Sequence, residues 1–68
     1  MIFRNKRVKI LVEHNGDTLI EVYKRDYLLF SAISRNEEEL GEDISDVRKI
    51  LQKYSKTALR WFNRRMRK

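Results

Sequence analysis

The chain has 68 residues, with sixteen Lys and Arg against ten Asp and Glu, so its formal net charge is +6. Cysteine is absent, which excludes disulfides, cysteine–zinc sites and thiol nucleophiles. No apolar run approaches the roughly 18 residues that a transmembrane helix needs. We therefore expect one small cytoplasmic domain, residues 1–68, that binds a partner and is not an enzyme.

The charge is divided unevenly along the chain. Residues 1–30 contain six basic and four acidic side chains, and residues 31–47 contain one basic and six acidic side chains. Residues 48–68 contain nine basic side chains and no acidic one. A terminal block with cations alone is typical of segments that bind a polyanion.

Alternating apolar and polar residues on both sides of Gly16 predict a β-hairpin. A two-residue loop would pair Ile10 with Glu21 across the strands, which mixes apolar and charged residues on one face. A three-residue loop that ends at Gly16 pairs Ile10 with Ile20, so we favour the longer loop. The expected strands are residues 6–13, 17–24 and, after a short polar break, 27–34.

The third expected strand, residues 27–34, has an alternative interpretation. Its length of eight residues and its aromatic content favour a strand, although several of its apolar residues also fit a helical face. The segment that follows, residues 35–42, is rich in glutamate and closes with Gly41. We expect an acidic turn there, either a loop or a single capped helical turn.

The C-terminal block predicts an amphipathic helix over about residues 44–66. At 100° per residue, its apolar side chains form one stripe, while Arg65 falls inside that stripe, so we expect the helix to extend beyond the core. The expected fold class is α+β: a three-stranded antiparallel β-meander followed by one long C-terminal amphipathic helix. The apolar stripe consists of Ile44, Val47, Ile50, Leu51, Tyr54, Ala58, Trp61 and Phe62.

One helix covers one face of a sheet, so the other face should remain open. Alternation predicts that Val8, Ile10, Val12, Ile20, Val22, Leu28 and Phe30 face the helix. An uncovered apolar face is typical of a partner surface, and we expect it to form a homodimer. The expected partner interface consists of Leu11, Leu19, Tyr23, Leu29 and Ile33.

The helix carries a cationic stripe opposite its apolar stripe. Six positive charges without an acid repel one another unless an anion neutralises them, so we expect phosphate contacts there. The expected nucleic-acid-binding residues are Lys49, Lys53, Lys56, Arg60, Arg64 and Arg67. The sequence thus favours a small nucleic-acid-binding accessory or regulatory protein, with duplex DNA preferred over RNA because a rigid charged helix suits a duplex backbone.

A second basic cluster lies near the N-terminus. Arg7 and Lys9 alternate with core-facing residues, so we expect them on a different side from the helix cations. They could contact a phosphate backbone, or they could protect an edge strand against aggregation. The members of this cluster are Arg4, Lys6, Arg7 and Lys9.

Other function classes have weaker support in the sequence. The main alternative is a protein-interaction module, a small inhibitor or adaptor that uses the open sheet face and docks its basic helix on an acidic protein partner. Membrane binding by residues 57–68 is not expected, because the apolar side of that segment is needed for the core. His14 is the single histidine and no catalytic motif is present, so we expect no catalytic residues, no metal and no cofactor.

Overall fold

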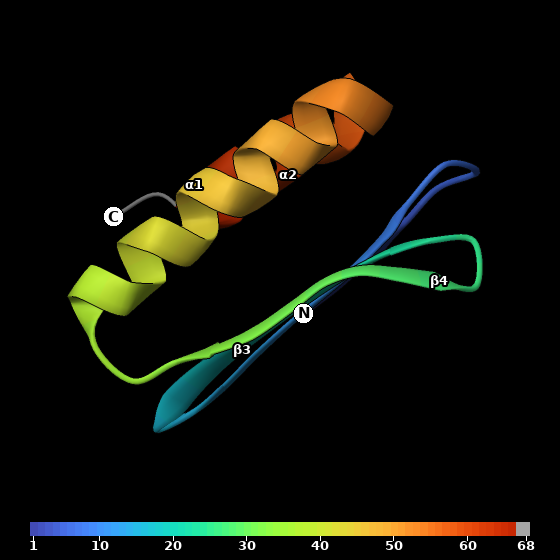
Figure 1. The fold of residues 1–68 in the computed structure, drawn as a ribbon. Helices are drawn as coiled ribbons and strands as arrows, with labels where there is room; N and C mark the ends of the chain where they lie inside the picture. The colour runs from blue at the N-terminus through green and yellow to red at the C-terminus, as the bar shows by residue number, and fades with distance from the viewer. Residues whose placement is uncertain (67–68) are drawn as a thin grey trace.

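The structure, a computed structural model, describes residues 1–66. Four strands form one antiparallel sheet in the order β1-β2-β3-β4, and both helices lie over the same face of that sheet (Figure 1). The α+β class is confirmed, but there are four strands and two helices where the sequence predicts three and one. The elements are β1 (Ile2–Arg4), β2 (Lys9–Asn15), β3 (Asp17–Lys24), β4 (Tyr27–Ser34), α1 (Glu37–Tyr54) and α2 (Lys56–Arg65).

The β2–β3 hairpin turns at Gly16, whose φ of 81° lies in the left-handed region that glycine adopts without steric cost. The sequence predicts Ile10 opposite Ile20, but the structure pairs Ile10 with Val22. The predicted register is wrong because Asn15 pairs with Asp17. The turn is therefore centred on Gly16, whereas the predicted three-residue loop is centred on Asn15. A register shift of two residues leaves every side chain on its original face, which is why the predicted hairpin faces remain correct.

β1 is an extra strand that the sequence analysis does not predict. The sequence predicts a strand over residues 6–13, whereas residues 5–8 form a turn between β1 and β2. The side-chain oxygen of Asn5 accepts hydrogen bonds from the backbone N–H groups of Arg7 and Val8, both at 2.8 Å. These bonds redirect the chain, so β1 pairs with β2 at the edge of the sheet.

Residues 27–34 form a strand, as predicted, and not the alternative helix. A bulge shifts the β3–β4 pairing between Val22 and Tyr23. It places Leu28 beside Tyr23 on the face away from the helices, where Leu28 is 53% exposed. Leu29 packs against the core on the helix side. The predicted positions of both leucines are therefore wrong, because strict alternation cannot show a bulge.

α1 begins at Glu37, where the sequence predicts an acidic turn over residues 35–42 and a helix only after it. Asn36 caps the helix, since its side-chain oxygen accepts a hydrogen bond from the backbone N–H of Glu39 at 2.9 Å. Three glutamates in the first turn add favourable charge at the positive end of the helix dipole. These contributions let the helix continue through Gly41.

The helical region is divided at Ser55, where the sequence predicts one helix over about residues 44–66. Ser55 has an extended backbone, with φ −159° and ψ 109°, and it both ends α1 and caps α2. Its hydroxyl oxygen accepts hydrogen bonds from the backbone N–H of Ala58 at 3.2 Å and from the side-chain nitrogen of Asn5 at 3.1 Å. A continuous helix would lose this contact with the β1–β2 turn.

α2 folds back beside α1, so the two helices form a hairpin over the sheet (Figure 1). The Nε atom of Arg48 donates a hydrogen bond to the side-chain oxygen of Asn63 at 2.7 Å, which joins the two helices. The ring of Trp61 packs on Phe3 of β1 with the ring centroids 5.2 Å apart, and Met66 also contacts the core. Within residues 1–66, the predicted extension of the helix beyond the core is therefore wrong, because the chain reverses at Ser55 and Met66 still packs against the core.

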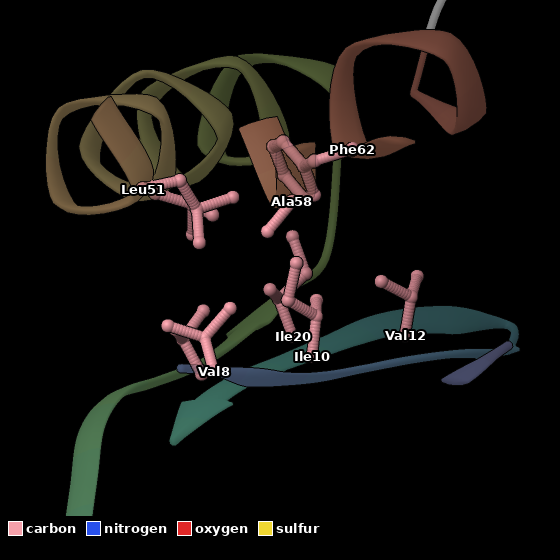
Figure 2. Close-up of a cluster of buried hydrophobic side chains, with 9 residues drawn as sticks. Val8, Ile10, Val12, Ile20, Leu51, Ala58 and Phe62 are labelled. Carbon is pink, nitrogen blue, oxygen red and sulfur yellow. The ribbon is translucent and has the colours of Figure 1, made fainter. Parts of the chain in front are cut away.

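The core lies between the sheet and both helices, as Figure 2 shows for side chains that point from the two layers toward one another. The core side chains are at most 1% exposed. The hairpin residues that the sequence predicts to face the helix are all among them. The buried apolar residues are Val8, Ile10, Val12, Ile20, Val22, Val47, Leu51, Ala58 and Phe62.

Candidate nucleic-acid interface

Three segments that are far apart in the sequence meet at one end of the molecule: the β1–β2 turn, the β3–β4 turn and the α1–α2 junction (Figure 1). Lys6 and Arg7 of the first turn line a hollow of about 540 Å³ together with Lys53 and Lys56 of the junction. Two adjoining hollows of about 300 and 250 Å³ share Lys6 and Arg7 with Arg25 of the second turn. The fold thus brings cations from separate segments around a common recess.

We name this recess the basic basin, defined as the three hollows and the residues that line them. Asp26 is the one acidic residue in that lining. Like charges that line a common recess repel one another and lower the stability of the folded chain, and the recess focuses their field toward an approaching anion. The cations of the basin are Arg4, Lys6, Arg7, Lys9, Lys24, Arg25, Lys53 and Lys56.

Asn5 holds the β1–β2 turn against the helices. Its side-chain oxygen accepts hydrogen bonds from two backbone N–H groups of the turn. Its side-chain nitrogen donates a hydrogen bond to the hydroxyl oxygen of Ser55, a residue that is only 4% exposed. Both ends of one amide group are therefore used to fix the turn and to dock it on the α1–α2 junction. Lys6 and Arg7 follow directly, so this contact positions them beside the helix cations.

The helix ends at the junction add to the electrostatics of the basin. Lys53 lies in the last turn of α1, where the helix dipole is negative and a cation is stabilised. α2 begins at Lys56 with no acidic residue in its first turn. The positive end of the α2 dipole therefore offsets the negative end of the α1 dipole at the same junction.

The β3–β4 turn carries the one non-glycine residue with a positive φ among residues 1–66. Arg25 has a φ of 56° at the first of the two loop positions, where glycine is normally preferred. The preceding residue, Lys24, places its ammonium nitrogen 4.9 Å from the ring centroid of Tyr54 at the end of α1. This cation–π contact ties the turn to the helix layer.

The structure does not place the six predicted helix cations on one straight ridge, because the chain reverses at Ser55. Residue Arg67 lies outside the described residues. The remaining five are exposed and are distributed over both helices: Lys49, Lys53, Lys56, Arg60 and Arg64.

Two of the predicted cations lie in the basic basin, namely Lys53 and Lys56. Lys49 lines a neighbouring hollow of about 320 Å³ between α1 and β4, together with Lys53. Arg60 and Arg64 lie one and two turns beyond the junction on α2. The predicted cations thus form two groups, one at or next to the basic basin and one that consists of the two arginines of α2.

The sequence predicts Arg7 and Lys9 of the N-terminal basic cluster on a different side of the molecule from the helix cations, and Lys9 does lie on the sheet face away from the helices. The structure instead places Arg7 in the same hollow as Lys53 and Lys56, because the turn after Asn5 interrupts the alternation of the strand. Arg25 was missed as a site residue. The sequence contains a signal for Arg25: it lies in a short turn between two strands, and that turn contains neither glycine nor proline.

The opposite end of the molecule is acidic. The N-terminus of α1 lies there beside the tip of the β2–β3 hairpin, where residues of both segments line a small hollow (Figure 1). Asp43 of α1 also accepts a hydrogen bond from the hydroxyl of Ser34 at the end of β4. The exposed acidic residues of α1 are Glu37, Glu38, Glu39, Glu42 and Asp46.

His14 lies near the end of β2. The Nδ1 atom of His14 lies 3.0 Å from the hydroxyl oxygen of Thr18 across the hairpin. Within residues 1–66, no group of three His, Asp or Glu side chains is placed to hold a metal ion. No helix in the same range combines the length and the apolar character needed to cross a membrane.

Comparison with known proteins gave no match: neither a family model, nor a curated protein, nor a solved structure is significantly similar to this chain.

Proposed function

We propose that this protein binds nucleic acid by holding backbone phosphates in the basic basin, as an accessory or regulatory protein. The observation that supports this proposal is the convergence of eight cations from three segments around one recess with a single acid. Lysine and arginine that neutralise phosphates release condensed counterions, and this release supplies most of the affinity for a nucleic acid.

Duplex DNA is the favoured ligand within this proposal. It carries one charge per roughly 1.7 Å of its axis, about twice the charge density of a single strand. A basin of closely spaced cations gains most from the densest array of phosphates. Phosphate contacts carry no sequence information, so we expect the protein to bind different duplexes with similar affinity.

The test compares two double charge reversals that change the net charge equally. Lys6→Glu with Lys53→Glu removes two cations from the basin, whereas Arg60→Glu with Arg64→Glu removes two from α2. All four side chains are exposed, so both variants should remain folded, which circular dichroism would check. Fluorescence anisotropy with a labelled duplex should show a loss of about 100-fold or more for the basin variant and less than about threefold for the α2 variant.

Two results would contradict the proposal. If both variants lose the same affinity for the duplex, the cations of α2 contribute as much to binding as those of the basin, and the basin is not the binding site. If duplex DNA, duplex RNA and single strands all bind more weakly than about 10 μM at low salt, within the non-specific range, the basin does not serve nucleic acid. In that case the alternative of an acidic protein partner, which would use the same cations, becomes the better account.

A further inference from the structure

The sheet face away from the helices is covered by no other segment of residues 1–66, and it is rich in apolar side chains (Figure 1). Ile2, Leu28 and Ile33 are 63%, 53% and 60% exposed. Leu11 and Leu19 lie between them and are only half-buried. An exposed face with this many apolar side chains on a small protein is typical of a contact with another molecule.

The charges on this face are ordered in a way that identifies the partner. Cross-strand pairing aligns its side chains in three rows at right angles to the strands. The row nearest the basic end contains Arg4, Lys9, Tyr23 and Leu28. The middle row contains Ile2, Leu11, Glu21 and Ser31, and the third row contains Glu13, Leu19 and Ile33.

We propose that a second copy of this chain packs on this face, with the strands antiparallel and the two-fold axis along the middle row. A two-fold axis makes the same patch contact itself, so the first row of one copy lies over the third row of the other. Lys9 then meets Glu13 of the partner subunit, while Tyr23 meets Leu19 of the partner subunit. Opposite charges and apolar groups are thus matched over most of the interface.

The other two-fold arrangement has its axis parallel to the strands, and it is less favourable. It places Leu11 opposite Glu21 of the partner subunit, which buries a carboxylate against an apolar group. It also brings the two basic basins to the same end of the dimer, where they repel each other. The antiparallel arrangement instead sets the basic end of each copy beside the acidic end of the other.

One contact in the proposed dimer is unfavourable. Glu21 lies in the middle row and therefore meets its own copy across the axis. Its carboxylate accepts a hydrogen bond from the hydroxyl of Tyr23 at 3.2 Å. The pKa of the Tyr23 phenol is raised above its ordinary value. The largest cause is partial loss of hydration, and the hydrogen bond to Glu21 and the negative charge of Glu21 add smaller contributions. Glu21→Gln removes the repulsion and should tighten the dimer.

The size of the face sets the expected affinity. The strands have three, seven, eight and eight residues. At about 3.3 Å per residue and about 4.8 Å between strands, the face covers roughly 400 Å² per copy. An interface of this size is in the range of weak, transient contacts. We therefore expect a dimer that dissociates in the micromolar range.

Sedimentation equilibrium on nucleic-acid-free protein, from about 5 to about 200 μM, tests the proposal. We expect Lys9→Glu and Glu13→Lys each to weaken dimerisation by about tenfold or more, because each places like charges opposite each other. The double exchange should restore the affinity to within about threefold. Leu19→Lys should give a monomer, and circular dichroism would show that this variant is folded.

Several outcomes would overturn the dimer. A wild-type monomer at the highest concentration excludes it. A double exchange no tighter than the single variants excludes the antiparallel register, as does a weaker dimer for Glu21→Gln. The measurement contains no nucleic acid, so its failure would leave the proposed function untouched.

Discussion

Arg25 occupies a backbone conformation that an L-residue normally avoids. Its φ of 56° places it in the left-handed region, which costs roughly 1–2 kcal/mol relative to glycine. Its side chain lines two hollows of the basic basin. A cation in a strained turn is consistent with a role in binding, since strain of this kind is concentrated at functional sites.

We predict that Arg25→Gly has opposite effects on stability and on binding. The free energy of unfolding should rise by about 1 kcal/mol, because glycine adopts the turn without strain. The affinity for duplex DNA should fall by about tenfold, because one phosphate contact is lost. Urea denaturation and fluorescence anisotropy measure the two effects.

Arg25→Lys is the matched control, since it keeps both the charge and the strained backbone. It should leave the stability unchanged and most of the binding intact. If Arg25→Gly binds duplex DNA as tightly as the wild type, Arg25 does not contact phosphate.

Asn5 is the other residue that determines the shape of the basic basin, because its side-chain amide fixes the β1–β2 turn against Ser55. We predict that Asn5→Ala lowers the free energy of unfolding by about 2 kcal/mol, because it leaves polar partners in the β1–β2 turn and at Ser55 unsatisfied. Chemical denaturation measures this change. A double-mutant cycle with Ser55→Ala should give a coupling of about 1 kcal/mol. Additive effects would show that the two side chains do not act together.

At the scale of elements, the two glycines test the helix and the hairpin separately. Gly41 lies inside α1 with open space where a Cβ would be, so Gly41→Ala should raise the free energy of unfolding by about 1 kcal/mol through helix propensity. Gly16 also has open space, but its φ of 81° disfavours any other residue. Gly16→Ala should therefore lower the stability by about 1–2 kcal/mol. Thermal or urea unfolding of both variants gives the comparison, and a destabilised Gly41→Ala would contradict the continuity of α1.

The hairpin could be predicted from its alternation, because the buried residues of β2 and β3 follow a period of two with no interruption. The bulge at Leu29 could not be predicted, since one extra residue in a strand moves the neighbouring side chain to the other face without changing the composition of the segment. β1 was missed because three residues are too few to show a period. Its position depends on the turn that Asn5 closes, which is a tertiary feature.

The break at Ser55 shows a second limit of sequence patterns. The apolar positions on both sides of it fit one continuous stripe, so periodicity predicts one helix. Serine is a good N-cap, but its choice of an extended backbone depends on the hydrogen bond from Asn5, 50 residues earlier in the chain. The same contact decides the candidate site, because it turns a predicted ridge along one helix into a recess shared by three segments.

On the scale of the whole molecule, the charge is separated along the sheet and the helices. The basic basin occupies one end, and the acidic start of α1 occupies the other (Figure 1). A polyanion is attracted to the first end and repelled by the second, so the charge distribution orients the protein as it approaches a nucleic acid. The net charge of +6 alone would give no such orientation.

The salt dependence of duplex DNA binding tests the central claim most directly. If the basin neutralises about five phosphates, log K should fall with log salt at a slope of about −4.5, which is a loss of about 500-fold between 50 and 200 mM salt. Lys6→Ala and Lys53→Ala should each make the slope shallower by about 0.9, whereas Arg60→Ala should leave it unchanged. The account would be contradicted if Arg60→Ala reduced the slope while the two basin variants kept that of the wild type.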